Sequence, residues 1–421
     1  MTSSGSTELQ AAPDVIVLGA GPAGLMAAAR LAQTPLNVAL VGPVVPSDPA
    51  REARTAALFP AALGELQAIG VWEKLAPVCA PISAIRIVDD MGRLFRAPEV
   101  RFEAREAGLD VLAQNVPNGP LVAALEAAAG LDGRIRRFPV PATEVACGDE
   151  AVRVTLATGE TLSAPLVVAA DGRNSKARTA AGIETRSWRY GQTAIAAAFQ
   201  HSRSHRGVSS EFHRPAGPFT VVPLPGHASS LVWLETPATV ERLVALDDRA
   251  FAREIMTRLG GLLGAVTAVA PRVTHPMGGL IAEQRAAKRV VLIGETAHAF
   301  PPIGAQGLNL TLRDVAALVE VVAEARARGR DLGGSETLAS YEDARGRDVT
   351  ARVYGVDLLN RSLIAGPLAG LARGVGLHAL HAVPALKRLA MRQGFGAASA
   401  RPAHHDADHR AEHAAGVPFE R

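Results

Sequence analysis

The stretch Val290 to Asp314, VVLIGETAHAFPPIGAQGLNLTLRD, decides where the rest of the chain is placed. Its apolar run Val290 to Ile293 has strand length and ends at Gly294, which predicts a buried parallel strand that opens onto a ligand-binding edge. A loop rich in Pro and Gly follows, and the helical spacing of apolar residues resumes at Leu308. The loop therefore delivers a helix amino terminus, with unpaired N–H groups and a positive dipole end, beside Glu295. Such a site suits an anion or an electron-rich ring, and an ordinary strand-to-helix connection is the alternative.

A second motif lies near the amino terminus, where the run Asp14 to Leu18 predicts a strand and an Ala-rich helix begins at Leu25. Between them stands the glycine pattern GAGPAG. Its three glycines allow a tight turn, a close approach of the backbone to a pyrophosphate, and close packing of helix on strand. The pattern alone is weak, but its position between strand and helix favours dinucleotide binding over a bland Gly-rich turn. The predicted contacts are Gly19, Gly21, Pro22, Ala23 and Gly24.

A third motif follows the apolar run Leu166 to Ala170, which ends in Asp171-Gly172. A carboxylate there would lie at the carboxyl edge of a parallel sheet, where a sugar hydroxyl or a diphosphate could meet it, although Asp-Gly after a strand can be just a turn. The strand expected over Asn37 to Val41 should end in an acid that binds a ribose. It ends in Gly42 instead, and Asp48 a few residues on could substitute.

Taken together, these stretches resemble the FAD-dependent aromatic hydroxylases and, within them, the ubiquinone-biosynthesis hydroxylases. The resemblance is carried by Pro301 to Asn309, by Arg313-Asp314, and by a DGxxSxxR signature at Asp171, Ser175 and Arg178. Relatives usually have Gly-Asp where this chain has Gly294-Glu295.

The family resemblance also implies roles for individual residues. It implies that Glu295 binds a ribityl hydroxyl of FAD and that Arg54 lies alongside the cofactor, although Arg54 could also be a solvated helix-start arginine. Backbone N–H groups would reach the flavin ring from Gly307, Leu308 and Asn309. Pro301, Pro302 and His298 are the candidates beside the reacting ring. Alternatively, His298 braces the loop by hydrogen bonding.

The chemistry implied by the resemblance is hydroxylation of an aromatic ring. NAD(P)H would reduce FAD, O2 would add at flavin C4a to give a hydroperoxide, and one oxygen would pass to a polyprenylated ubiquinone precursor. Two alternatives stay open: a flavin hydroxylase or halogenase of another small aromatic compound, and a non-catalytic FAD-binding scaffold of a quinone-biosynthesis complex. The isolated Trp72, Trp188 and Trp233 argue against a halogenase, whose WxWxIP element is missing.

Between Thr185 and Pro276 the pattern changes to short alternating runs separated by Gly and Pro, which predicts an inserted antiparallel sheet with one face free to cover the flavin. The run Ile82 to Phe95 predicts a hairpin of the same sheet. Four residues could line an aromatic substrate pocket or form plain core: Phe212, Phe219, Val221 and Trp233.

The predicted fold class is α/β, with a Rossmann-like FAD-binding domain, an inserted antiparallel-sheet substrate domain and carboxyl-terminal helices. The FAD-binding domain is expected over residues 14–80, 110–181 and 277–350, and the substrate domain over 81–109 and 182–276. A helical segment would cover 351–396, and 1–13 and 397–421 would be flexible tails.

The composition narrows the function further. The 421 residues carry a net charge of +3, from 44 basic and 41 acidic side chains, which gives nucleic-acid binding little support. Two distant cysteines without ligand spacing favour neither disulfides nor a metal site. The four histidines of the tail after Arg401 are assigned no metal.

No signal peptide and no bilayer-spanning run is apparent, so a cytoplasmic protein is expected. Leu358 to Ala400 holds five basic residues and no acid, which suggests helices that touch the anionic surface of the inner membrane or pack on their own protein.

Overall fold

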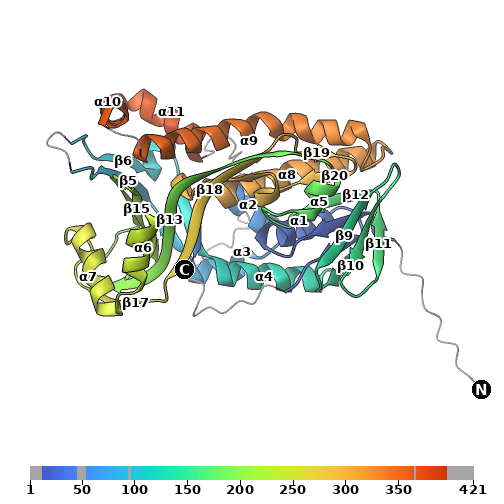
Figure 1. Cartoon of the computed structure of the whole chain (residues 1–421), viewed down its shortest axis with the longest axis horizontal. Coiled ribbons are helices and arrows are strands. Elements are labelled where there is room, and N and C mark those ends of the chain that lie inside the picture. The colour runs from blue at the N-terminus through green and yellow to red at the C-terminus, as the bar shows by residue number, and fades with distance from the viewer. Residues whose placement is uncertain (1–11, 45–53, 93–95, 365–366, 396–421) are drawn as a thin grey trace, which may run out of the picture.

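The computed structural model describes residues 12–44, 54–92, 96–364 and 367–395, and Figure 1 shows their arrangement. A six-stranded sheet with mostly parallel strands forms one half of the molecule, and a larger sheet forms the other half. The long strand β13 (Thr185–His201) and its partner β18 (Val273–Ala282) belong to the larger sheet, and helix α9 (Ser335–Ile364) runs along one side of the molecule.

The first sheet has six strands in the order β19, β20, β12, β1, β2, β8. All neighbouring pairs are parallel except β19 with β20. The strands are β1 (Val15–Leu18), β2 (Val38–Val41), β8 (Ile135–Phe138), β12 (Leu166–Ala169), β19 (Ala286–Ala287) and β20 (Val290–Leu292).

The apolar runs of this sheet form strands because both faces are covered. Alternate residues such as Val15 and Val17 pack against the helices α1 (Pro22–Ala32), α4 (Asn118–Leu131) and α8 (Gln306–Ala327). Their neighbours Ile16 and Leu18 pack against helix α5 (Lys176–Ala180) and a three-stranded sheet. Parallel strands buried on both faces are expected to be continuously apolar, which is the pattern of Val290 to Ile293. Their carboxyl ends all meet at one edge.

The larger sheet has nine strands, in the order β21, β18, β13, β16, β15, β14, β5, β6, with β17 beside β13. Its other members are β5 (Ala84–Asp89), β6 (Val100–Glu103), β14 (Val208–Arg214), β15 (Gly217–Leu224), β16 (Ala228–Glu235), β17 (Val266–Val269) and β21 (His298–Ala299). The pair β5 and β14 is parallel, so the sheet is mixed at that point and not purely antiparallel.

Two small sheets complete the β-structure: β3 (Thr55–Leu58), β7 (Ala113–Pro117) and β4 (Ala80–Ile82); and β9 (Ala142–Cys147), β10 (Val152–Leu156) and β11 (Thr161–Ala164). The α-helices are α1 (Pro22–Ala32), α2 (Pro60–Ala68), α3 (Trp72–Leu75), α4 (Asn118–Leu131), α5 (Lys176–Ala180), α6 (Pro237–Val244), α7 (Asp248–Leu259), α8 (Gln306–Ala327), α9, α10 (Pro367–Ala382) and α11 (Pro384–Phe395). Short 3-10 turns are η1 (Ala76–Val78), η2 (Ala104–Ala107), η3 (Gly294–Thr296) and η4 (Ile303–Ala305).

The predicted α/β class is confirmed, and two local details differ. β5 pairs with β6, which begins at Val100, so the second strand of the hairpin predicted for Ile82 to Phe95 lies further along the chain; residues 93–95 lie outside the described ranges. Helix α9 is continuous across the boundary expected at residue 350, because buried Tyr341, Val349 and Val356 keep one of its sides packed. The domain limits themselves stay a prediction. Within the described ranges, no helix combines the length and apolar character needed to cross a bilayer.

Candidate active site

The three sequence motifs lie at neighbouring strand ends. β20, β12 and β1 are adjacent and parallel, so the loops that follow them begin at the same edge of the sheet. Direct contacts join the loops: Ala170 N donates to Leu18 O at 2.7 Å, and Thr296 Oγ1 donates to Ala169 O at 2.7 Å. Arg178 ties the second loop to the third, because its buried guanidinium donates to Thr296 O at 2.8 Å.

The glycines of the first loop differ in their surroundings. A Cβ on Gly24 would lie 1.8 Å from Gly19 O, and one on Gly19 would lie 2.2 Å from Ala170 O. These two positions exclude any side chain because backbone packs on backbone there. A Cβ on Gly21 would meet no atom within 4 Å, and Gly21 caps the amino terminus of α1. The open space therefore lies where the free amides of the helix point.

Gly42 explains why β2 does not end in an acid. Its φ is +154°, and a Cβ there would lie 2.7 Å from Ala20 N in the glycine loop. A side chain at this position would push the glycine loop away from the sheet. Asp48, the suggested substitute, lies outside the described residues. Arg54 is described and exposed at the start of β3.

The third loop ends at the amino terminus of α8. Ala305 precedes the helix with a φ of +53°, and no side chain caps it. Asn309 is buried and its amide group is fully used, because Phe59 N donates to its Oδ1 at 2.9 Å and its Nδ2 donates to Ala57 O and Ala305 O, both at 2.7 Å. Gly307 is exposed, and a Cβ there would meet nothing within 4 Å. A ligand would therefore meet the helix amides and not the Asn309 side chain.

A buried ionic network holds this loop in place. His298 Nε2 donates to Asp314 Oδ2 at 2.7 Å, and Gly294 N donates to the same oxygen at 3.1 Å. Arg345 from α9 donates to Asp314 Oδ1 at 2.8 Å and to Asp348 at 2.8 Å. His298 is only 2% exposed. His298 is thus held against Asp314, as the bracing alternative expects, and a place beside the reacting ring stays a prediction.

The Asp314 carboxylate is ionised in this network. Burial by itself would raise its pKa, but His298 and Arg345 together hold the pKa below the ordinary value of an aspartate. The opposite effect acts on Tyr341, where burial raises the pKa well above the usual tyrosine value. Its hydroxyl donates to Leu292 O at 3.0 Å, so it also fixes the end of β20.

The remaining predicted cofactor residues belong to the loops that follow β12 and β20. Glu295 is exposed, and Arg173 Nε lies 3.3 Å from its carboxylate. Asp171 accepts from Lys176 N at 2.8 Å through Oδ2, whereas its buried Oδ1 has no hydrogen-bond partner among the described residues. Pro301 is buried and Pro302 is exposed beside the helix end. An acceptor without a donor is what a bound hydroxyl would satisfy.

The four residues that could line an aromatic substrate pocket or form plain core lie in a hydrophobic core cluster. These four residues, Phe212, Phe219, Val221 and Trp233, are buried against helices α6 and α7. Phe219 and Trp233 pack edge to face with ring centres 5.3 Å apart. Strand alternation turns their neighbours to the other side of the sheet, where Val222 packs with Phe59 and Ala305 next to the start of α8.

Sequence reasoning missed the side chains that the sheet turns toward α8. Thr220, Val222 and Val232 are half-buried, unlike the fully covered aromatics between them. Thr220 is directly opposite Val232, so they form one patch on β15 and β16. Tyr190 borders it, and its hydroxyl donates to Asp357 at 2.7 Å. The alternation itself was the available signal, but it does not say which side faces the cofactor.

These observations define a class of protein: an α/β protein whose adjoining parallel strand ends and helix amino termini suit a dinucleotide. The residues fit FAD, because the space over Gly21 suits a pyrophosphate, the Asp171 acceptor lacks a donor, and the open amino terminus of α8 suits the oxygen and nitrogen edge of a ring. A family model described as FAD binding domain matches residues 12–354. The chain belongs to this family, as an FAD-dependent monooxygenase of the group that contains the ubiquinone hydroxylases.

Three relatives illustrate the similarity. The ubiquinone hydroxylase UbiL of Rhodospirillum rubrum is 36% identical over 389 residues, which cover 91% of this chain and 89% of that protein. The 3-demethoxyubiquinol 3-hydroxylase of Escherichia coli is 28% identical over 391 residues, covering 91% and 98% of the two chains. The crystal structure of p-nitrophenol 4-monooxygenase PnpA from Pseudomonas putida superposes with a TM-score of 0.72 at 18% identity and covers 91% and 98% of the chains. The last likeness concerns the fold.

Proposed function

We propose that this protein hydroxylates the aromatic ring of a polyprenylated ubiquinone precursor, with FAD, O2 and a reduced nicotinamide donor. The observation that carries the proposal is the open amino terminus of α8 opposite the half-buried patch of Thr220, Val222 and Val232. The similarity to ubiquinone hydroxylases over 91% of the chain supports the choice of substrate. When bound, FAD supplies the activation of O2 and the transfer of one oxygen atom to the ring.

The protein's own groups have three tasks in this proposal. The amides at the start of α1 hold the pyrophosphate of FAD over Gly21, and the Glu295 carboxylate accepts a hydrogen bond from a ribityl hydroxyl. The amides at the start of α8, around Gly307 and Leu308, donate to the electron-rich edge of the flavin ring, where the helix dipole favours negative charge. Arg54, which is exposed just before β3, would contact the bound cofactor.

The substrate ring would lie between this helix end and the sheet. Pro301 and Pro302 shape the edge of the space beside the flavin. Proline has neither a backbone N–H nor an ionisable side chain, so these residues do not transfer protons but position the ring and exclude water. The Asp314 network acts indirectly, because it keeps the loop after β20 fixed while the cofactor and the substrate bind and dissociate. His298 belongs to this network as a positioning residue.

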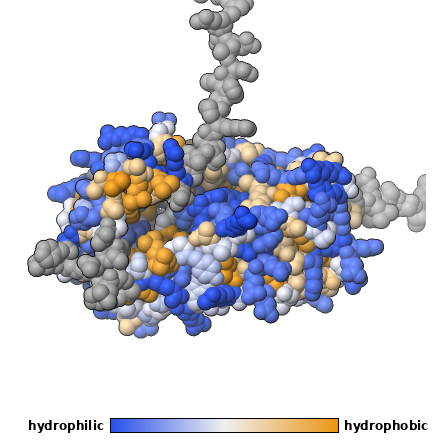
Figure 2. All heavy atoms as spheres, turned by 90° about the horizontal axis from the view of Figure 1, so that it is seen from above, coloured by the Kyte–Doolittle hydropathy of each residue, from blue (hydrophilic) through white to orange (hydrophobic). Residues whose placement is uncertain are grey.

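The tail of the substrate is apolar, and a surface contact with a membrane is part of the proposal. Exposed apolar side chains lie near the end of α9, at Leu358 (70% exposed), between α10 and α11, at Val383 (45%), and on α11, at Leu389 (50%) and Leu386 (40%). Helix α11 also carries the exposed Arg388 and Arg392. Figure 2 shows apolar side chains among polar ones at the end of the molecule that carries α10 and α11. Apolar and basic groups side by side suit an anionic bilayer surface.

The test uses the purified full-length protein with its bound flavin. NADH or NADPH oxidation is followed with and without a prenylated demethoxy precursor, and the product is analysed by mass after incubation under isotopically labelled O2. The proposal expects oxidation stimulated by the precursor and a product that has gained one labelled oxygen atom. Turnover of simple phenols with no turnover of the prenylated precursor would favour a hydroxylase of another aromatic. A bound flavin that neither NADH nor NADPH reduces, with or without the precursor, would favour a non-catalytic FAD-binding scaffold.

A further inference from the structure

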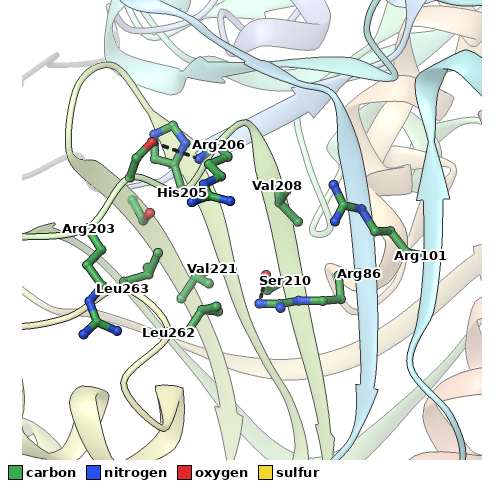
Figure 3. Close-up of a pocket in the computed structure, with 12 residues that line it drawn as sticks. Arg86, Arg101, Arg203, His205, Arg206, Val208, Ser210, Val221, Leu262 and Leu263 are labelled. Atoms are coloured by element: carbon green, nitrogen blue, oxygen red, sulfur yellow. Dashed lines mark hydrogen bonds between the residues drawn. The ribbon is translucent and has the colours of Figure 1, made fainter.

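We propose that a second pocket, on the opposite side of the larger sheet from the FAD site, binds the phosphate group of a molecule with an apolar chain. The pocket has a volume of about 560 Å³ and is shown in Figure 3. Its floor is formed by β5, β14 and β15, at the point where the cover provided by α6 and α7 ends. The loop 203–206 and the turn after α7, with Leu262 and Leu263, form the wall on one side, and Arg101 of β6 stands on the other.

The sheet separates this pocket from the flavin loop. Val221 and Ser210 are paired in register and both line the pocket. The next residue, Val222, points the other way and packs with Phe59 and Ala305 near the start of α8. One thickness of sheet therefore lies between the two sites, and an occupant of the pocket is not the ring that reacts.

The charge of the pocket is strongly positive. Four arginines line it, and no carboxylate does: Arg86, Arg101, Arg203 and Arg206. Glu99 lies 3.9 Å from Arg86 and Glu103 lies 3.1 Å from Arg101, so two of the four guanidiniums have a counter-ion. Among the described residues, no ion pair involves Arg203, which donates to Gly261 O at 3.0 Å, or Arg206. About two positive charges remain uncompensated at one rim.

A buried donor also lacks an acceptor. Arg86 lies across β14 and donates from Nη2 to Ser210 Oγ at 3.0 Å (Figure 3). Its Nε is buried and has no hydrogen-bond partner among the described residues. A buried N–H of a charged group costs free energy unless an acceptor reaches it. An anion in the pocket would supply that acceptor.

The lining indicates which anion fits. Guanidinium groups match the oxygens of phosphate in pairs, and two uncompensated charges suit a phosphate monoester or a diphosphate better than a single carboxylate. Val208, Val221, Leu262 and Leu263 give the rest of the pocket an apolar surface. The shared chemistry is therefore a phosphate group on an apolar chain, as in a prenyl diphosphate or in the headgroup region of an anionic phospholipid.

The experiment measures binding to the flavin-loaded, full-length protein by calorimetry, with farnesyl diphosphate, inorganic diphosphate and farnesol as separate probes. We expect farnesyl diphosphate to bind more tightly than either part alone. The variant Arg203→Gln/Arg206→Gln should weaken its binding about tenfold or more. The matched control Arg249→Gln/Arg253→Gln removes the same charge from exposed positions on α7 and should leave binding unchanged. Thermal unfolding and bound flavin check that each variant is folded, and Arg206→Gln alone replaces the double variant if that one unfolds.

A second arm distinguishes a free ligand from a lipid. Vesicles of phosphatidylglycerol and of phosphatidylcholine are sedimented with the wild type and with both double variants. Farnesyl diphosphate binding, or phosphatidylglycerol binding, that is lost only in Arg203→Gln/Arg206→Gln supports the site and identifies its source of phosphate. No binding by any phosphate probe, or equal loss in the two double variants, overturns the proposal.

Discussion

The two glycines Gly21 and Gly24 give opposite predictions although they stand three residues apart. At Gly24 an added Cβ would lie 1.8 Å from Gly19 O, and contacts of this kind do not fall below 3.0 Å, so backbone must move by about 1 Å. Overpacking of this kind costs about 1–3 kcal/mol or more. At Gly21 the φ is −77° and the Cβ would meet nothing within 4 Å, so Gly21→Ala should change the free energy of unfolding by less than about 1 kcal/mol.

The affinity for FAD, unlike the free energy of unfolding, should be sensitive to Gly21→Ala. The Gly21→Ala methyl group would occupy the space where the pyrophosphate approaches the amides of α1. Losing one hydrogen bond to a charged group costs about 1.5–3 kcal/mol, so the Kd for FAD should rise about ten- to a hundredfold. Denaturant unfolding and FAD titration of the apoprotein measure the two quantities. A Gly21→Ala protein that binds FAD as tightly as the wild type would refute the placement of the pyrophosphate over this residue.

The other predictions concern the loop brace and the second strand. Asp314→Asn leaves Arg345 buried with only Asp348 as a partner, so it should lower the free energy of unfolding by about 3 kcal/mol. The exposed control Asp343→Asn should leave the free energy of unfolding unchanged. Equal effects of the two variants in denaturant melts would contradict the role of the network. The pKa of Asp314 is lowered in the folded state, so its ionised carboxylate stabilises the fold fully above the unfolded pKa of about 3.9 and loses this effect as the pH falls further. The difference in free energy of unfolding between the wild type and Asp314→Asn should therefore become smaller in acid. A difference that grows in acid would contradict this expectation. Gly42→Asp should lower the free energy of unfolding by about 1–3 kcal/mol and should not tighten FAD binding, which denaturant melts and FAD titration would measure. A stable variant with a higher affinity for FAD would show that an acid at the end of β2 is missing from the FAD site.

The sequence predicted the strand ends well because each motif carries its own local cause. Gly19 and Gly24 are required by backbone contacts that any βα turn of this type makes, and the run Val290 to Ile293 is apolar because both faces of its sheet are covered. The order of the three motifs along the chain matches that of the family, and it predicted that their loops lie at one edge of the sheet. The geometry of parallel strands makes that edge common to all of them.

The parts that the sequence could not predict depend on contacts between distant segments. Alternation in β15 and β16 gives two faces, and both are partly covered, so the larger aromatics Phe219 and Trp233 gave no sign of facing α6 and α7. The brace on His298 needs Arg345 from another helix, and nothing near His298 in the chain announces it. The pocket of four arginines is assembled from strands and loops that lie as far apart in the chain as Arg86 and Leu263.

The most direct test of the central claim is a crystal structure of the flavin-loaded protein. The claim is that the loops after β1, β12 and β20 hold one FAD, with its ring at the start of α8. Electron density should show the pyrophosphate within hydrogen-bond distance of the amides that follow Gly21, and the ring beside Gly307, facing Val222. Density for the flavin in any other place, or a ring that is turned away from the sheet, would contradict the account.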